Sequence, residues 1–275
     1  MTFRPRARNL APTVDPSSLS ATAAEPMTGV AATPLSFFLL GATGRTGLPF
    51  LSQALARGHF VTIFARNISK LPAALTSHPH LRAFTGELHE ADKVAQAMRG
   101  AKPDVVYVML ASEAAPYTAV SSGTHSALLA LRELKAAAVE PRATSFTGAT
   151  PFISIAAWGL GPTGAYITGL FARMLVNIAK ASFWSKPLTD FKKQLAEVEE
   201  AKGKGVIRPT LILPPMLNNG EKTNTYLSGE ASTMKHAMGV TNSVSRASMA
   251  DLCLKLGEKA ASGKEVPQWV GITNP

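Results

Sequence analysis

Cysteine is nearly absent from this 275-residue sequence, which contains Cys253 alone. A single cysteine excludes an intrachain disulfide and a cysteine-based metal cage. Because Cys253 lies in the apolar helical run 249–254, we expect a small buried side chain rather than a reactive thiol. The lack of disulfides is typical of a reducing compartment, so we expect a cytoplasmic protein.

Acidic residues are also scarce. Asp and Glu number 18 against 28 Lys and Arg, which gives a formal net charge of +10. A surface of this charge favours anionic partners, including nucleic acid, membranes and phosphorylated cofactors. The sequence has no zinc-finger spacing, no RNA-binding aromatic signature and no long Lys/Arg block. No apolar run approaches the roughly 18 residues of a membrane span. We therefore expect the basic surface to serve an anionic cofactor or substrate, and we expect neither a nucleic-acid nor a membrane partner.

Motifs for metal and hydrolytic chemistry are missing as well. The six histidines are scattered without ligand spacing, so we expect no metal site. No Gly-x-Ser-x-Gly elbow or paired-carboxylate arrangement indicates a hydrolase. Nothing in the sequence specifies an oligomeric state.

Residues 1–34 differ in composition from the rest of the chain. They contain Arg4, Arg6 and Arg8 and are rich in Ala, Ser, Thr and Pro, without a helical period. We predict a poorly ordered leader here, followed by one globular domain over residues 35–275. A mitochondrial targeting peptide is the alternative, because such peptides are rich in Arg and Ser, although two acids and the prolines at positions 5, 12, 16 and 26 weaken it.

Short apolar runs alternate with helical patterns from residue 35 onward. Buried strands are predicted at 35–40, 60–65, 81–85, 104–110, 151–156 and 206–213, with a short final strand at 268–272. Helices are predicted between the first two strands and at 91–99, 118–138, 170–181 and 247–261. This alternation predicts an α/β fold, a doubly wound parallel sheet of the Rossmann type with helices on both faces. The late loops would form a small C-terminal substrate-side region.

Three glycines follow the first predicted strand, in the run 41–47 (GATGRTG). The first permits a sharp strand-to-helix turn, the second lets a pyrophosphate approach the backbone, and the third lets the helix pack closely on the strand. The helix N-terminus then offers free N–H groups and a positive dipole end. We therefore predict a dinucleotide-phosphate loop in a domain over residues 35–275. The loop residues expected to contact the cofactor are Gly41, Thr43, Gly44, Arg45, Thr46 and Gly47.

The end of the second predicted strand bears on the choice of cofactor. NAD-selective sites usually carry an acid there, which binds the ribose 2′-hydroxyl. This chain has Arg66 instead, whose planar and permanently charged guanidinium suits a 2′-phosphate. Lys70 could add charge, or could be a solvated surface residue. We therefore predict NADP(H) as the cofactor.

The sequence resembles the atypical short-chain dehydrogenases, in particular the NmrA-like proteins and the biliverdin-IXβ (flavin) reductases. The resemblance rests on residues 41–48 (GATGRTGL) and 61–66 (VTIFAR), and it extends over roughly residues 35–220. It implies that residues 86–88 (GEL) lie beside the adenine, where the family often has Gly-Asp-Val. It also implies that the prolines after the sixth strand flank the nicotinamide. The further cofactor contacts that we expect are Leu88, Leu110, Ala111, Ala156 and Pro214.

The sequence departs from this family in the groups that would transfer a proton. The usual Tyr-x-x-x-Lys pair is absent, since Leu170 stands four residues after Tyr166. The serines that often end the fifth strand are replaced by Ala156 and Ala157. Another hydroxyl at the carboxyl edge of the sheet could still give a proton to a substrate. The candidate catalytic residues are Tyr117, Tyr166 and Ser112.

Other side chains near this edge are open to two interpretations. Trp158 directly follows the fifth strand, where it could form the wall of an aromatic pocket or part of the core. Lys186, Asp190 and Lys193 begin a charged helix, and we expect them to form a solvated face.

Three functions are compatible with this pattern. The first is an NADP(H)-dependent oxidoreductase, a reductase acting on a small apolar, aromatic or conjugated substrate. The second is a non-catalytic, NADP-sensing regulatory protein of the NmrA type, which the missing serines favour. The third is an isomerase or epimerase on the same fold. The sequence favours the oxidoreductase, because hydride transfer is chemistry that the cofactor itself supplies.

Overall fold

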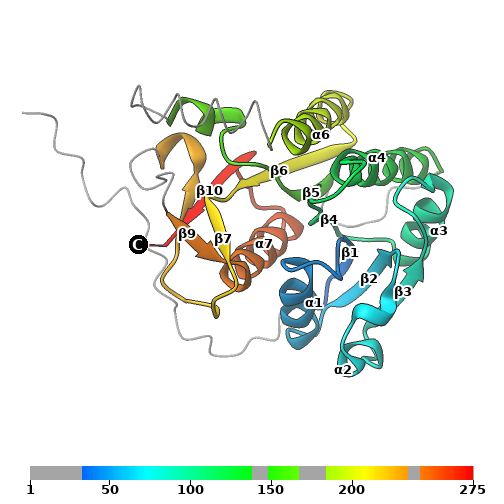
Figure 1. The fold of residues 1–275 in the computed structure, drawn as a ribbon. Coiled ribbons are helices and arrows are strands. Elements are labelled where there is room, and N and C mark those ends of the chain that lie inside the picture. The colour runs from blue at the N-terminus through cyan, green and yellow to red at the C-terminus, as the bar shows by residue number, and fades with distance from the viewer. Residues whose placement is uncertain (1–32, 138–147, 167–183, 235–241, 275) are drawn as a thin grey trace, which may run out of the picture.

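The computed structural model describes residues 33–137, 148–166, 184–234 and 242–274. Its centre is an eight-stranded sheet in the order β3-β2-β1-β4-β5-β6-β10-β8 (Figure 1). Neighbouring strands are parallel, except that β8 runs antiparallel to β10. The strands of this sheet are β1 (Ser36–Leu40), β2 (Phe60–Ala65), β3 (Leu81–Thr85), β4 (Val105–Val108), β5 (Thr150–Ile155), β6 (Ile207–Leu213), β8 (Leu227–Glu230) and β10 (Trp269–Thr273).

Helices cover both faces of the sheet. The α1–α7 layer packs on one face, and α3, α4 and α6 pack on the other (Figure 1). The α-helices are α1 (Gly47–Ala56), α2 (Ala73–Thr76), α3 (Ala91–Ala101), α4 (Ala119–Ala137), α6 (Ser185–Gly203) and α7 (Arg246–Ala261). Short 3-10 helices are η2 (Ile68–Lys70), η3 (Gly161–Tyr166) and η4 (Ala231–Thr233). The predicted doubly wound α/β fold is confirmed.

The strand order reverses at β1, which lies between β2 and β4. Leu40, the last residue of β1, is in register with Phe64 of β2 on one side and with Val108 of β4 on the other. Successive β1 residues alternate between the two faces, so Phe37 belongs to one core cluster and Phe38 to the other. In open α/β sheets, ligands bind in the crevice at the carboxyl ends of the strands where the order reverses. The fold therefore places a binding crevice beyond Leu40 and Val108.

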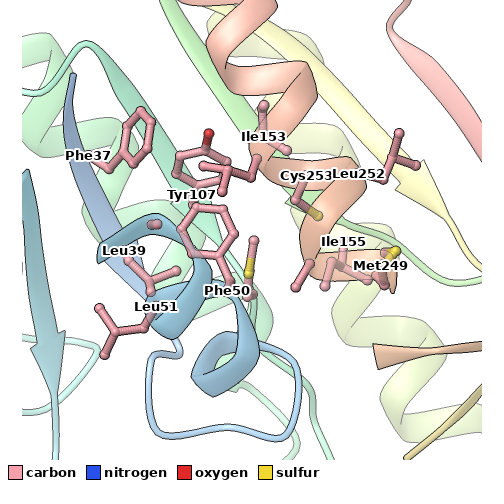
Figure 2. Packing of buried hydrophobic residues seen from close by; sticks show 14 of the residues in the cluster. Phe37, Leu39, Phe50, Leu51, Tyr107, Ile153, Ile155, Met249, Leu252 and Cys253 are labelled. Atoms are coloured by element: carbon pink, nitrogen blue, oxygen red, sulfur yellow. The ribbon is translucent and has the colours of Figure 1, made fainter. Parts of the chain in front are cut away.

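The core beneath the α1–α7 layer centres on Tyr107 of β4 (Figure 2). Its ring is fully buried, with its centroid 5.2 Å from that of Phe37 and 4.4 Å from that of Phe50. A Cβ at Gly257 would overlap the Tyr107 hydroxyl, so this glycine lets α7 lie close to the sheet. Burial raises the pKa of Tyr107 well above its ordinary value. Cys253 lies in the same cluster and is buried, as predicted.

The chain after β6 forms a small region attached to α7. Its second sheet consists of β7 (Met216–Asn218) and β9 (Ser243–Ser245), which run parallel. Residues of the intervening segment bind the first two turns of α7, Asn219 and Tyr226 through their side chains and Thr223 through its backbone N–H. These hydrogen-bonded pairs are Arg246–Asn219, Thr223–Ser248 and Tyr226–Asp251, at 2.7, 2.9 and 2.8 Å.

Several elements differ from their predicted bounds. The fourth strand ends at Val108 rather than at 110, because the chain leaves the sheet to form the crevice wall. The strands β7, β8 and β9 were not predicted, since runs of three or four residues carry too weak an apolar pattern. The predicted helix at 170–181 and residues 1–32 of the leader lie outside the described residues. No helix in the described ranges is long and apolar enough to cross a membrane.

Candidate functional site

The turn after β1 requires glycine at two of its positions. Gly41 has a φ of 93°, in the left-handed region, and a Cβ there would overlap the carbonyl oxygen of Met109. A Cβ at Gly47 would overlap the carbonyl oxygen of Gly41. Gly44 closes the turn, since its N–H donates to the Gly41 carbonyl at 2.9 Å. As a result, α1 begins directly against the end of β1.

The N-terminus of α1 is open to an anion. Its N-cap residue, Thr46, makes no side-chain capping bond, and its first turn contains no acidic residue. The first N–H groups of a helix lack partners within the helix, and the helix dipole is positive at this end. Gly44 adds no side chain in front of them. The turn therefore fits a phosphate group in both space and hydrogen-bond donors.

A cavity of about 830 Å³ follows the carboxyl ends of the strands from this turn to β6. Its size lies within the usual range for ligand and cofactor sites. Of the residues expected to contact a cofactor, Gly47 packs behind the turn and the others line the cavity. Those that line it are Gly41, Thr43, Gly44, Arg45, Thr46, Arg66, Leu88, Leu110, Ala111, Ala156 and Pro214.

One end of the cavity, beyond β2, is basic. Arg66 is exposed there and has no hydrogen bond or ion pair with any residue that the structure describes. Asn67 shapes the loop that follows, since its side chain accepts from the Ser69 N–H at 2.9 Å. Lys70, at the end of that loop, also lines the cavity. Two cations and no carboxylate among the described residues therefore face a ligand at this end.

The carboxyl end of β5 is apolar. Ala156 and Ala157 line the cavity there. Ser154 instead points into the protein, where it is fully buried. Its hydroxyl donates to the Val108 carbonyl at 3.1 Å and accepts from the Gln194 side chain at 2.6 Å. Ser154 thus connects β4, β5 and α6, and it lies away from any ligand in the cavity.

The cavity wall next to Ala156 is aromatic. Trp158 lines the cavity and also packs against the core, so both interpretations of this residue apply in part. Its indole N–H is buried and has no hydrogen-bond partner among the residues that the structure describes. Trp184 stands at the rim with 47% of its surface exposed. The further apolar lining residues here are Pro187, Leu188, Phe191, Pro214, Pro215 and Leu217.

Ser112 lies just after β4 and is joined to Asp190 of α6. The Ser112 hydroxyl donates a hydrogen bond to the Asp190 carboxylate. Asp190 also accepts from the N–H groups of Val120 and Ser121 at 2.9 and 3.0 Å. The expectation of a solvated face was wrong for Asp190, which is 2% exposed. The carboxylate is buried because it caps α4, a contact that local sequence does not reveal.

The two tyrosines that are candidate proton donors differ in their position relative to the cavity. Tyr117 lines the cavity and has a φ of 58°, an unusual value for a residue with a side chain. The Lys186 ammonium lies 5.7 Å from the centroid of its ring. Tyr166 ends η3, and its side chain lies outside the described part of the structure. Of the two, Tyr117 is the one whose side chain the structure places at the cavity.

Two charged residues at the cavity mouth were missed by the sequence analysis. Glu113 forms an ion pair with Arg45 of the glycine turn. Arg246 lines the cavity from the start of α7 and is partly buried. No local motif marks either residue, because their positions depend on how distant elements pack. Among the described residues, no cluster of three or more His, Cys, Asp or Glu could hold a metal ion.

A glycine turn that presents an open helix N-terminus, at the point where a doubly wound sheet reverses its strand order, defines a nicotinamide-dinucleotide-binding protein. Comparison with known families agrees. The chain belongs to the NAD(P)H-binding family, whose model matches residues 41–259. The predicted resemblance to short-chain dehydrogenases is confirmed at the level of the fold, which the chain shares with a solved short-chain dehydrogenase/reductase and a solved anaerobillin reductase.

Similar proteins include redox enzymes. The averufin oxidase stcO of Emericella nidulans is 26% identical over 257 residues, which cover 86% of this chain and 82% of that protein. A Veillonella parvula short-chain dehydrogenase/reductase in complex with NADP superposes with a TM-score of 0.63 at 14% identity, over 87% of this chain and 94% of that one. ChuY, an anaerobillin reductase from Escherichia coli, superposes with a TM-score of 0.59 at 18% identity, over 87% of this chain and 97% of that one. The fold is thus one that oxidoreductases use.

Proposed function

We propose that this protein is an NADP(H)-dependent reductase of small apolar substrates that contain aromatic or conjugated rings. The observation that carries the proposal is one continuous cavity, which joins the glycine turn to the aromatic wall around Trp158 and Trp184. Gly44 and Thr46 would hold the phosphates, and Ala156 and Pro214 would hold the nicotinamide end. The substrate would then lie between that end and the aromatic wall.

The preference for NADP(H) over NAD(H) is argued from Arg66 and Lys70. Both basic side chains line the cavity beyond β2, where an NAD-selective site would carry an acid. A guanidinium that has no partner among the described residues is free to bind a 2′-phosphate through two parallel hydrogen bonds. The Veillonella neighbour is a complex with NADP, which supports the same choice.

The substrate class is argued from the composition of the cavity wall. Trp158, Trp184 and Phe191 offer ring faces, and the prolines after β6 add rigid apolar surface. A flat, apolar molecule would bury most contact area against such a wall. The names of two relatives, an oxidase and a reductase, support redox chemistry at this site.

The proton for the reduced product is proposed to come from Tyr117. When bound, the cofactor supplies the hydride. The Tyr117 phenol lines the same cavity, and the Lys186 ammonium lies 5.7 Å from the centroid of its ring. Ser112 is less suited, because its proton is already donated to Asp190. The Ser112 oxygen can still accept a hydrogen bond from the ligand.

A regulatory protein that binds NADP(H) without turnover is the second candidate. The observation in its favour is the Ala156–Ala157 edge, which offers a substrate carbonyl no hydroxyl group from β5. Ser154 does not replace that hydroxyl, since Val108 and Gln194 bind it inside the protein.

An assay of NADPH consumption tests the reductase. Purified protein is mixed with NADPH and with flavin or quinone acceptors, and the loss of the reduced-cofactor absorbance is followed. We expect turnover, a fall in kcat of about 100-fold in Tyr117→Phe, and a raised KM for the acceptor in Trp184→Ala. Phe60→Ala is the matched control, because Phe60 is a similarly exposed aromatic residue away from this cavity.

The remaining outcomes decide against the reductase. Tight binding of NADPH without turnover of any acceptor would favour the regulatory protein. No binding of NADPH by the folded protein would contradict both candidates.

A further inference from the structure

Arg246 occupies a specific place at the α1–α7 contact. It is the first residue of α7, and the next residue, Ala247, accepts a hydrogen bond at 2.9 Å from the Gln53 side chain of α1. The first turn of α7 is therefore fixed beside α1, the helix that starts at the glycine turn. The Arg246 side chain lines the cavity from this side.

The Arg246 guanidinium is held but not neutralised. One of its terminal nitrogens donates to the Asn219 side chain at 2.7 Å, and its other nitrogens have no hydrogen-bond partner in the part of the chain that the structure describes. Burial, and then the neighbouring positive charge of Arg45, lower the pKa of Arg246, while Glu113 raises it. An anion placed between the two arginines would relieve their mutual repulsion and fill the free donors.

The surroundings indicate which anion fits. Arg246 lines the same cavity as Arg45 of the glycine turn and as Glu113, the ion-pair partner of Arg45, and it interacts electrostatically with both. The aromatic wall is carried by other elements, namely the end of β5 and the start of α6. We infer that Arg246 binds the cofactor pyrophosphate from the α7 side, opposite Arg45. This inference rests on the proposed NADP(H) site.

This second contact couples the cofactor to the C-terminal region. Asn219 directly follows β7, and Arg246 directly follows β9, so one guanidinium joins the paired strands to the pyrophosphate. Glu113 must release Arg45 when the phosphates enter, because both compete for the same guanidinium. Cofactor binding would thereby fasten the region after β6 against the glycine turn.

Binding measurements on Arg246→Gln test the inference with two probes. NADPH contains the whole pyrophosphate, whereas adenosine 2′-monophosphate contains the 2′-phosphate but neither phosphate of the pyrophosphate. We expect Arg246→Gln to weaken NADPH about tenfold or more and the monophosphate by less than about twofold, with Arg246→Lys between wild type and Gln for NADPH. Arg82→Gln is the matched control, since Arg82 carries the same charge on the edge strand β3 and does not line this cavity.

Each contrary result has its own meaning. If Arg246→Gln, folded by circular dichroism, binds NADPH as tightly as Arg82→Gln does, the inference is overturned. Equal losses for both probes would also overturn it, because Arg246 would then act through the general positive field. Failure of the wild type to bind NADPH would instead refute the proposed function, and this inference with it.

Discussion

The hydroxyl of Ser112 and the carboxylate of Asp190 are joined by a hydrogen bond between the end of β4 and helix α6. The same carboxylate accepts from the backbone N–H groups of Val120 and Ser121. Asp190 therefore supplies the cap of α4 from another helix, and it fixes a cavity-lining residue at the same time. A charge that sequence alone would assign to the surface is buried because these three donors satisfy it.

Replacing Asp190 by Ala is expected to lower the free energy of unfolding by about 2–4 kcal/mol, since a helix cap and charge-assisted hydrogen bonds are lost together. Urea denaturation measures the change. Lys193→Ala, at an exposed position of the same helix, is the control and should change stability by less than about 0.5 kcal/mol. Equal effects of the two variants would show that the Asp190 cap contributes nothing.

Two glycines of the turn should respond differently to alanine. A Cβ at Gly44 would lie 3.1 Å from the Gly41 carbonyl, which is tight but not an overlap. We expect Gly44→Ala to lower the free energy of unfolding by no more than about 1 kcal/mol. Its affinity for NADPH should fall at least about tenfold, because the methyl group would stand where the pyrophosphate approaches. Fluorescence titration and urea denaturation of the same preparation give both values.

Gly41→Ala should instead destabilise the folded protein. Its φ of 93° and the overlap with the Met109 carbonyl should lower the free energy of unfolding by more than about 2 kcal/mol. Normal stability of Gly41→Ala would show that the turn can rearrange, and normal NADPH binding by Gly44→Ala would exclude the phosphate site at this turn.

Arg66→Ala tests the choice between the two nicotinamide cofactors. We expect NADPH affinity to fall about tenfold to 100-fold, because a charge-assisted contact with the 2′-phosphate is lost, while NADH affinity changes less than about twofold. Parallel titrations with both cofactors give the ratio, and Arg82→Ala controls for the overall change in charge. A similar loss for both cofactors would remove Arg66 from the 2′-phosphate site.

Acid should destabilise the protein through α7. Burial alone would raise the pKa of Asp251 and of Glu258, but partners outweigh it and hold both values below their ordinary range. For Asp251 these partners are Lys255 and Tyr226, and for Glu258 they are His59 and Arg57. A carboxyl group whose pKa is lowered in the folded state stabilises the protein when the pH is above its unfolded-state pKa, which is near 3.8 for Asp251 and 4.5 for Glu258. That contribution is lost as the pH falls through the folded-state values.

Denaturant titrations between about pH 7 and pH 3 measure this loss. Asp251→Asn should be less stable than wild type at neutral pH, and its stability should fall less steeply on acidification. A variant whose stability falls as steeply as that of the wild type would show that Asp251 does not contribute to the acid sensitivity.

The sequence alone was sufficient for features that depend on local backbone geometry. Apolar strand runs and helical periods predicted the doubly wound sheet, because side-chain periodicity follows directly from strand and helix geometry. The spacing of Gly41, Gly44 and Gly47 predicted the turn, since a positive φ at Gly41 and close backbone approaches at Gly41 and Gly47 leave room there for no other residue. Arg66 could be located because it directly follows a strand whose end was recognisable.

Only the tertiary structure decided the features that depend on contacts between distant elements. It buried Asp190 beneath α4, turned Ser154 into the protein and brought Arg246 beside Arg45. It also added β8 as an antiparallel edge strand. The side chains involved give the same local pattern whether they are exposed or buried. Their roles are set by the packing of helices on the sheet, and no short stretch of sequence records that packing.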